Sequence, residues 1–193
     1  MKPSEHNFQK VLPSQFYLRD TLTVARSLIG KGLVVRSRGE LLAVEITETE
    51  AYLGQRDPAS HSYHGPTARN RSMFEGGGTC YVYLSYGMHY CMNVVTGPVG
   101  VGEAVLIRAA RPILGEPTFF KNRKTRDPRL LMNGPGKLAQ ALGINLSFDG
   151  ETFSSDRIRL VNLGRSTKTI TATPRIGISQ ARELPYRFLA GEV

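Results

Sequence analysis

Hydrophobic positions along the chain follow two spacings, and the spacing typical of strands is the more frequent one. Residues 32–37 and 40–47 are apolar for most of their length and flank Arg38-Gly39, which predicts a β-hairpin. Further strands are expected at residues 80–84, 89–95, 103–110, 157–163 and 167–173. The pattern therefore predicts a chain built mainly from short strands.

Two segments have apolar residues at helical spacing. One covers residues 21–29, begins at a cap formed by Asp20 or Thr21, and is followed by Gly30. The other opens at residues 133–137, runs to Leu142 and stops at Gly143.

Two other stretches lack a clear period. Residues 54–78 are rich in Pro, Gly, Ser, His and Arg, and we expect a long irregular loop there. Residues 120–129 set five basic side chains against Asp127, which predicts a solvated and mobile basic loop. Such a loop would either contact DNA phosphates or only keep the protein soluble.

The length of 193 residues suits one domain with one sizeable core. We expect residues 16–193 to form this domain and residues 1–15 to be a flexible N-terminal lead-in. No run approaches the roughly 18 apolar residues that cross a bilayer, and residues 1–9 lack an apolar signal region. We therefore expect a cytoplasmic, nucleoid-associated protein with no membrane partner. The sequence has no obvious association segment, so we also expect a monomer.

Basic residues outnumber acidic ones, and this excess points to a polyanionic partner. The chain has 25 Lys and Arg against 16 Asp and Glu, with a formal net charge of +9 and a pI of about 9.8. Nucleic acid is the first candidate for the partner. A merely basic protein and a protein of anionic membrane surfaces are the alternatives that charge alone leaves open.

The cysteines and histidines do not form a metal-binding pattern. Cys80 and Cys91 fall in one predicted hairpin where they would not face each other, and we expect both to be reduced thiols. His61 and His64 are three residues apart, but no Cys-x-x-Cys accompanies them. The sequence therefore predicts no metal site.

Candidate chemistry begins where the apolar run 41–47 becomes polar. Side chains alternate along a strand, so Glu48, Glu50 and Tyr52 would share one face and project into an adjoining pocket. We interpret Glu50 as a catalytic base. The alternative is that both glutamates are solvated carboxylates at a strand end, paired with some of the arginines.

Two further positions suggest function. Arg108 interrupts the apolar run 103–110, where a guanidinium needs an anionic neighbour such as Glu50. A purely structural buried ion pair is the alternative there. Tyr86 lies at the tip of the predicted hairpin beside Gly87, and a ring held at such a tip suggests insertion or stacking.

Two segments offer contacts to phosphates. Residues 67–71 combine a hydroxyl group with two guanidinium groups, although a solvated basic turn is equally compatible with them. Residues 134–137 open a helix whose N-terminus could bind one phosphate. The spacing of a nucleotide-hydrolysing phosphate loop is absent, which excludes that function.

Four motifs occur in a fixed order: ETEAYLG at 48–54, RNRSMF at 69–74, YVYLSYGMHYCMN at 81–93 and GPGKL at 134–138. Together with His61, they make the chain resemble the alkyladenine (3-methyladenine) DNA glycosylases over about residues 22–188. The resemblance implies one compact mixed α+β domain. This domain would have a curved antiparallel sheet, flanking helices and a protruding β-hairpin that intercalates into DNA.

The resemblance also implies an activity. Enzymes of that family flip a damaged purine out of duplex DNA and hydrolyse its N-glycosidic bond, with no metal or cofactor. Glu50 would activate the water and stabilise the developing oxocarbenium charge, while Arg108 would help to hold the water. A backbone carbonyl near Ile178 would complete the water site. No lysine is expected beside Glu50, which implies a monofunctional hydrolase.

By the same resemblance, Tyr52 and Tyr83 would sandwich the flipped base and His61 would hydrogen-bond to it. Asn93 would crowd the amino group of normal guanine. The expected substrates are 3-methyladenine, hypoxanthine and ethenoadenine. The residues that would replace the flipped nucleotide are Tyr86 and Met88, and those that would contact the DNA backbone are Thr67, Arg69, Arg71, Gly136 and Lys137.

Two other functions stay open. A non-catalytic reader of damaged nucleic acid would keep the pocket but would not need Glu50. An RNA-binding protein would use exposed aromatic rings on single strands or on A-form duplex. The segment 120–129 matches the family poorly, and residues 1–15 do not take part in the resemblance.

Overall fold

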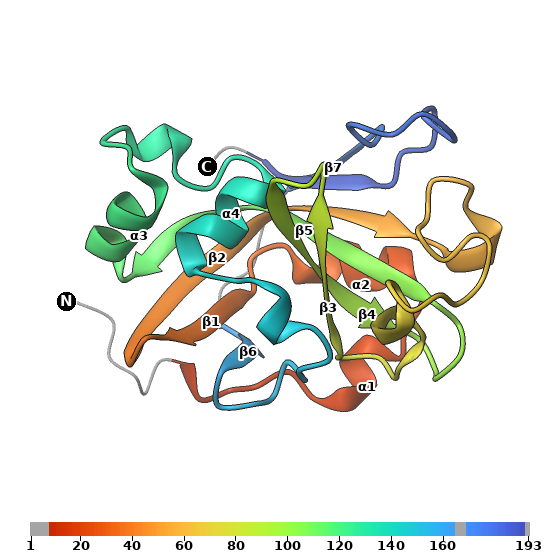
Figure 1. The fold of residues 1–193 in the computed structure, drawn as a ribbon, viewed down its shortest axis with the longest axis horizontal. Helices are drawn as coiled ribbons and strands as arrows, with labels where there is room; N and C mark the ends of the chain where they lie inside the picture. Colours follow the sequence, from red (N-terminus) through yellow and green to blue (C-terminus); the bar gives the residue numbers. More distant parts are fainter. Residues whose placement is uncertain (1–7, 165–168, 192–193) are drawn as a thin grey trace.

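The computed structural model describes residues 8–164 and 169–191. Within them, an antiparallel sheet of eight strands forms the centre of a single domain (Figure 1). The main path is β3-β4-β5-β2-β1-β6, and β8 joins β2 while also pairing with β7. The strands are β1 (Gly32–Ser37), β2 (Glu40–Tyr52), β3 (Cys80–Ser85), β4 (His89–Thr96), β5 (Glu103–Leu114), β6 (Ile158–Val161), β7 (Ile170–Thr173) and β8 (Arg187–Ala190).

The sheet curls around β2. The first half of this strand pairs with β1 and its second half with β8, while β5 runs along its other edge. The pairing with β5 shifts register between Ile46 and Glu48 and again between Glu48 and Thr49. Because such bulges bend a strand and increase its twist, they help to close the sheet into a half-barrel.

Helices pack against the curled sheet. α2 (Thr21–Leu28) begins at Asp20, whose carboxylate accepts a hydrogen bond from the Thr23 N–H. α4 (Pro135–Leu142) ends at Gly143, which has a φ of 71°. The remaining helices are α1 (Ser14–Tyr17), α3 (Glu116–Arg123) and the 3₁₀ turns Gly54–Arg56, Arg71–Phe74, Pro128–Leu130 and Leu146–Phe148. In the part of the chain that the structure describes, no helix is both long and apolar enough to span a membrane.

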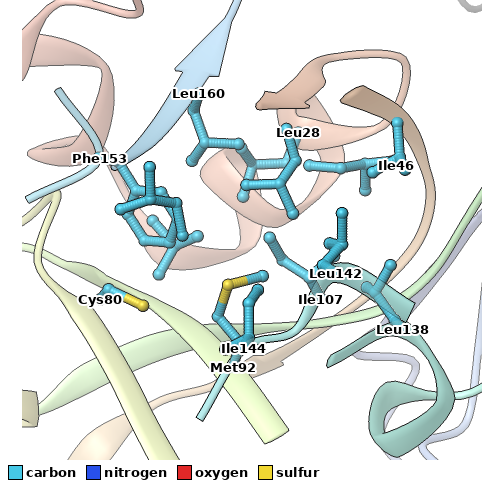
Figure 2. Close-up of a cluster of buried hydrophobic side chains, with 14 of the residues drawn as sticks. Leu28, Ile46, Cys80, Met92, Ile107, Leu138, Leu142, Ile144, Phe153 and Leu160 are labelled. Carbon is cyan, nitrogen blue, oxygen red and sulfur yellow. The ribbon is translucent and has the colours of Figure 1, made fainter. Parts of the chain in front are cut away.

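The main core lies where α2 and α4 face the sheet. Leu28 of α2, Met92 of β4 and Ile107 of β5 are no more than 1% exposed, and Figure 2 shows them together with Leu138 and Leu142 of α4. Burial of each such side chain contributes about 1.5–3 kcal/mol. This core holds β2 and β5, the two strands that carry most of the candidate chemistry.

The predicted hairpins and both predicted helices are confirmed, but two strands are longer than expected. β2 continues to Tyr52 and β5 continues to Leu114. β8 was not expected from the sequence. It forms because β2 offers a free edge beyond the end of β1, to which β8 binds over Glu48, Thr49 and Glu50.

The expectation of a mobile loop at residues 120–129 is wrong for its first part. Residues 116–123 form α3, and Phe119 on this helix is fully buried. Arg123 donates a hydrogen bond to the Leu131 carbonyl (3.0 Å), which ties the helix to the following turn. Phe119 and the partly buried Phe120, which both pack on the main core, thus anchor a segment that is otherwise strongly basic.

The segment expected to be a flexible lead-in is also partly ordered. Phe8 is 1% exposed, and the Leu12 N–H donates to the Leu160 carbonyl (2.8 Å) at the edge of β6. Residues 8–15 thus pack against the domain instead of preceding it. Residues 1–7 lie outside the described residues, as do residues 167 and 168 at the start of the expected strand 167–173.

Candidate active site

A cavity of about 400 Å³ lies beside the end of β2. This volume falls in the range of small-molecule sites. Strands β2 to β5, the loop after β2 and the turn at 176–178 all contribute to its wall. The lining residues are Tyr52, Ala59, His61, Arg69, Met73, Tyr81, Tyr83, Ser85, Tyr86, Cys91, Asn93, Leu106, Arg108, Pro135, Ile176, Gly177 and Ile178.

Glu50 lies behind this wall, and its side chain is fully buried. Its Oε2 accepts hydrogen bonds from the Tyr52 hydroxyl (2.9 Å) and from Arg108 (3.2 Å). Its Oε1 accepts a hydrogen bond from the Ile176 N–H (2.8 Å). A buried carboxylate is costly unless it is paired and hydrogen-bonded, and these donors meet that need. The contact between Glu50 and Arg108 that the sequence predicted is confirmed.

Arg108 also connects Glu50 to a second carboxylate. Its Nε donates to Oε1 of Glu48 (2.7 Å), and the Nε of Arg187 donates to the same oxygen (2.5 Å). Burial lowers the pKa of Arg108, but the Glu50 and Glu48 carboxylates outweigh this effect and raise it. The guanidinium therefore stays charged at a point where β2, β5 and β8 meet.

A buried ion pair anchors the turn that brings Ile176 to Glu50. Arg175 donates to the two Asp57 oxygens (2.5 and 2.8 Å) and to the Ala51 carbonyl (2.9 Å). Burial raises the pKa of Asp57, but hydrogen bonds from Arg175 and from two backbone N–H groups outweigh this and lower it. The pair thus links the end of β2 to the C-terminal turn.

Aromatic rings form two sides of the cavity. The Tyr52 ring has the Arg175 guanidinium 4.7 Å from its centroid. The Tyr83 ring lies edge-on to His61, with centroids 4.4 Å apart, and stacks on Tyr81 at 5.5 Å. The structure therefore brings Tyr52, His61 and Tyr83 to the same cavity, as the sequence predicted.

His61 is open to the cavity, and its Nδ1 lies 3.0 Å from the Tyr81 hydroxyl. Desolvation by its neighbours lowers the pKa of His61, and the nearby Arg69 charge lowers it further. The imidazole is therefore neutral near pH 7. Burial raises the pKa of Tyr81 to about 12, so that its hydroxyl keeps its proton.

Asn93 and Ile178, both predicted from the sequence, also line the cavity. Asn93 is 5% exposed, and its amide donates to the Tyr81 carbonyl (3.1 Å), which fixes the side chain. Ile178 belongs to the turn that also carries Ile176. This one short segment therefore lines the cavity and also donates a hydrogen bond to Glu50.

The tip of the β3–β4 hairpin carries two large exposed side chains. Tyr86 is 86% exposed and Met88 is 72% exposed. Tyr86 also has a φ of 49°, in the left-handed region that bulky residues seldom adopt. Strain of this kind at an exposed ring is a sign of function.

Three residues expected to contact the DNA backbone lie on the loop before β3. Arg69 lines the cavity and donates to the Leu84 carbonyl (3.0 Å), while Arg71 is exposed at the start of a 3₁₀ turn. Thr67 is exposed as well, but its hydroxyl donates to the Asn70 side chain (2.9 Å) and so helps to close the local turn.

The other two, Gly136 and Lys137, share a neighbouring cavity of about 380 Å³ with Tyr86. Lys137 donates to the Asn133 side chain (2.7 Å). A Cβ atom on Gly136 would lie 2.8 Å from the Cβ of His89, so the absence of a side chain lets α4 approach β4 closely. The sequence did not indicate this packing role.

No cluster of three or more His, Cys, Asp or Glu side chains within residues 8–164 and 169–191 could hold a metal ion. Cys80 and Cys91 are free buried thiols. They lie opposite Val94 and Tyr83, respectively, so they do not face each other across the hairpin.

Comparison with known proteins identifies the family to which this site belongs. A family model described as methylpurine-DNA glycosylase matches residues 15–192. The chain belongs to the methylpurine-DNA glycosylase family. This membership confirms the resemblance inferred from the motifs and makes the protein a hydrolase of N-glycosyl bonds that acts in DNA repair.

Similar proteins share nearly the whole length of this glycosylase. A relative from Carboxydothermus hydrogenoformans is 47% identical over 180 residues, which cover 92% of this chain and 94% of its own. One from Methanoculleus marisnigri is 46% identical over 181 residues, which cover 92% and 93%. One from Francisella tularensis is 47% identical over 172 residues, which cover 87% and 89%. All three bear the name "Putative 3-methyladenine DNA glycosylase".

Several groups in the site of this glycosylase were not expected from the sequence. They are Asp57, Arg175, Arg187 and the N–H of Ile176. Their hydrogen bonds join the end of β2 and the loop after it to the C-terminal turn and to β8. The only available signal was an arginine beside apolar residues at 175–178, because a charge in such a place needs a partner.

Proposed function

We propose that this glycosylase removes damaged purines of the 3-methyladenine, hypoxanthine and ethenoadenine type from duplex DNA, with Glu50 as the general base. The observation that carries the proposal is the setting of Glu50. It is a fully buried carboxylate, hydrogen-bonded by Arg108 and Tyr52, directly behind the wall of a cavity large enough for a purine.

The chemistry of the proposed reaction follows from this setting. A carboxylate offers about four acceptor positions, and the described residues fill three of those on Glu50. Oε1, which carries one bond from Ile176, can accept a further hydrogen bond from the attacking water. Glu50 takes a proton from this water, hydroxide adds to C1′ of the sugar, and the base leaves with the electron pair of the N-glycosidic bond.

Arg108 and the negative charge of Glu50 act together in this step. Positive charge develops on the sugar as the bond to the base breaks, and the nearby carboxylate stabilises that charge. Arg108 holds the carboxylate in place through its hydrogen bond to Oε2 (3.2 Å). The groups that touch Glu50 form no Schiff base, so the proposed product is an abasic site in an intact strand.

The cavity would hold the flipped base by stacking and by shape. Tyr52 and Tyr83 offer two aromatic faces, each worth about 1–3 kcal/mol per stacked base. A neutral His61 can hydrogen-bond to the purine, while Asn93, held by the Tyr81 carbonyl, would crowd the guanine amino group.

The hairpin and the basic loops would hold the DNA. Tyr86 and Met88 would enter the duplex and fill the space that the nucleotide leaves, which offsets an unstacking cost of a few kcal/mol. The free-energy cost of this step is lowest for lesions that are weakly paired. Backbone contacts are assigned to Thr67, Arg69, Arg71, Gly136 and Lys137.

The test is base release from duplex DNA that carries one hypoxanthine, 3-methyladenine or ethenoadenine, with EDTA present and alkali added afterwards to cut abasic sites. We expect wild type to release the base and Glu50→Gln to lose about 10²–10⁴-fold in rate. Glu45→Gln is the matched control, because Glu45 is also buried and paired across β2 and β5, with Arg111 (2.8 Å). Arg111 does not line the cavity, whereas the partners of Glu50, which are Tyr52, Arg108 and Ile176, all do. Tight lesion binding without base release from any of these substrates would instead identify a non-catalytic reader of damage.

A further inference from the structure

Glu48 stands out among the acidic groups near the cavity because one of its oxygens serves two guanidiniums. Oε1 accepts hydrogen bonds from Arg108 (2.7 Å) on β5 and from Arg187 (2.5 Å) on β8. The three side chains are only 12–18% exposed, so solvent does little to weaken these bonds. The proposed reaction assigns no part to Glu48 or to Arg187.

The backbone of β2 departs from regular pairing at this residue. The register with β5 shifts on both sides of Glu48, whereas Thr49 to Tyr52 pair regularly with Ile107 to Ala104. A bulge re-aims the side chain that it carries, and bulges often lie next to functional sites. The residues that these two shifts leave without a partner are Thr47 of β2 and Arg108 of β5, which flank the Glu48–Ala109 pair. The irregularity on β5 therefore falls at Arg108, the residue that meets the Glu48 carboxylate.

Arg108 is held at two edges of its planar guanidinium. Its Nε donates to Glu48, and one of its terminal nitrogens donates to Glu50 (3.2 Å). Because the guanidinium is rigid, fixing the Nε edge also fixes the direction of the terminal nitrogens. The contact with Glu48 is the shorter of the two, so the orientation of Arg108 toward Glu50 depends on Glu48.

We propose that Glu48 is a positioning residue of this active site, held by Arg187, which orients Arg108 toward Glu50 and balances the charge of the two guanidiniums. The inference rests on the proposed role of Glu50. It gives the C-terminal strand β8 a part in the chemistry, although Arg187 does not line the cavity.

The charges that surround Glu50 decide what each variant would do. Glu48 and Tyr52 come from β2, Arg108 from β5, and Arg187 acts from β8 through Glu48. Tyr83 and Cys91 face the site from β3 and β4, and Arg175 faces it from the C-terminal turn with its charge paired to Asp57. Glu48 and Glu50 are thus the two carboxylates that pair with the Arg108 and Arg187 guanidiniums.

Two substitutions should move the acid limb of the pH–rate profile in opposite directions. Glu48→Gln removes a negative charge about 7 Å from Glu50, which is the separation of alternate residues on a strand. Glu50 is then the one carboxylate left near the positive charges of Arg108 and Arg187, which favour its ionised form. The acid limb should then move to lower pH by about one unit, with a loss of about tenfold in the single-turnover rate. Arg187→Met leaves the Glu48 charge without its second partner and should move the limb to higher pH by a smaller amount.

Two further variants separate position from charge and from stability. Glu48→Asp keeps the charge, but its side chain is one methylene group too short to hold Arg108 in the same way. We therefore expect a slower single-turnover rate, with the acid limb at nearly the same pH as in wild type. Glu45→Gln breaks a similar ion pair on the same two strands and should lower the melting temperature while leaving the pH profile unchanged.

The measurements are single-turnover base release between pH 5 and 9 and thermal unfolding of each variant. Equal pH profiles for wild type, Glu48→Gln and Arg187→Met would show that Glu48 is structural and would overturn the inference. Should wild type release no base at all, the proposed function fails instead. A titration of the Glu50 carboxyl carbon by NMR would then still decide whether Glu48 and Arg187 act on Glu50 with opposite signs.

Discussion

At the scale of the single residue, His61 lines the cavity, and its burial and a neighbouring arginine set its charge. Desolvation lowers the pKa of His61, and Arg69 lowers it further. Arg69→Ala should therefore raise the pKa of His61, because loss of a nearby positive charge favours the imidazolium. NMR titration of the imidazole would measure this shift. Arg71→Ala removes an exposed arginine of the same loop that does not act on His61, and it should leave the titration unchanged.

Tyr86 is a residue whose backbone and side chain both work against stability. Its ring is 86% exposed and its φ is 49°. Tyr86→Gly should leave the melting temperature unchanged or slightly higher, because glycine adopts positive φ without strain. Base release from duplex DNA should fall at least tenfold, since the space left by the flipped nucleotide would stay empty.

A different result would follow at Tyr83, which packs against His61 and Tyr81. Tyr83→Ala should lower both the melting temperature and the activity. Equal losses of stability in Tyr86→Gly and Tyr83→Ala would argue against an exposed, DNA-directed ring at Tyr86.

At the scale of elements, the Asp57–Arg175 pair joins the C-terminal turn to the end of β2. Asp57→Asn leaves a buried guanidinium without its anion and should lower the free energy of unfolding by about 3–5 kcal/mol. The pKa of Asp57 is lowered from 3.8, so its stabilisation is present above pH 3.8 and is lost as the pH falls below that value.

Urea unfolding between pH 7 and pH 3 measures both effects. Wild type should lose stability toward pH 3 more steeply than Asp57→Asn does. Asp127→Asn is the control, because Asp127 pairs with the exposed Arg129 at the surface and should contribute nothing measurable. The same slope in wild type and Asp57→Asn would contradict the role of the pair.

The contact between α4 and β4 depends on a glycine. The Cβ of Gly136→Ala would lie 2.8 Å from the Cβ of His89, so the helix must move, and we expect a loss of about 1–3 kcal/mol in the free energy of unfolding. Gly134→Ala is the matched control, since a Cβ there meets nothing within 4 Å. Thermal or urea unfolding of the two variants would measure the difference, and equal stability would show that α4 moves without cost.

At the scale of the whole molecule, the net charge of +9 should dominate binding to undamaged DNA. Affinity for a duplex without a lesion should fall linearly on a plot of log K against log salt. Lys137→Gln should reduce the slope by about 0.9, the value for one phosphate contact on B-DNA. Arg157→Gln, whose guanidinium is already paired with Glu151 (2.7 Å), should leave the slope unchanged. Fluorescence anisotropy at several salt concentrations would make this comparison.

The sequence alone determined those helices and hairpins whose start, end or turn is marked by residues close together in the chain. The cap at Asp20, the stop at Gly143 and the turn at Arg38-Gly39 predicted helices and a hairpin that the structure contains. The contact of Arg108 with Glu50 was also predicted, because a guanidinium inside an apolar strand needs an anionic neighbour. The motifs identified the family through residues that neighbour each other in sequence.

Only the tertiary structure decided the contacts between distant segments. Arg187 and Glu48 lie 139 positions apart, and nothing local in either segment indicates that they share a hydrogen bond. The Ile176 N–H reaches Glu50 across 126 positions, through a turn that the Asp57–Arg175 pair holds. Hydrophobic spacing reports which face of an element is buried but not which other element buries it. The pairing of β8 with β2, and with it the full surroundings of Glu50, therefore appears only once the chain is folded.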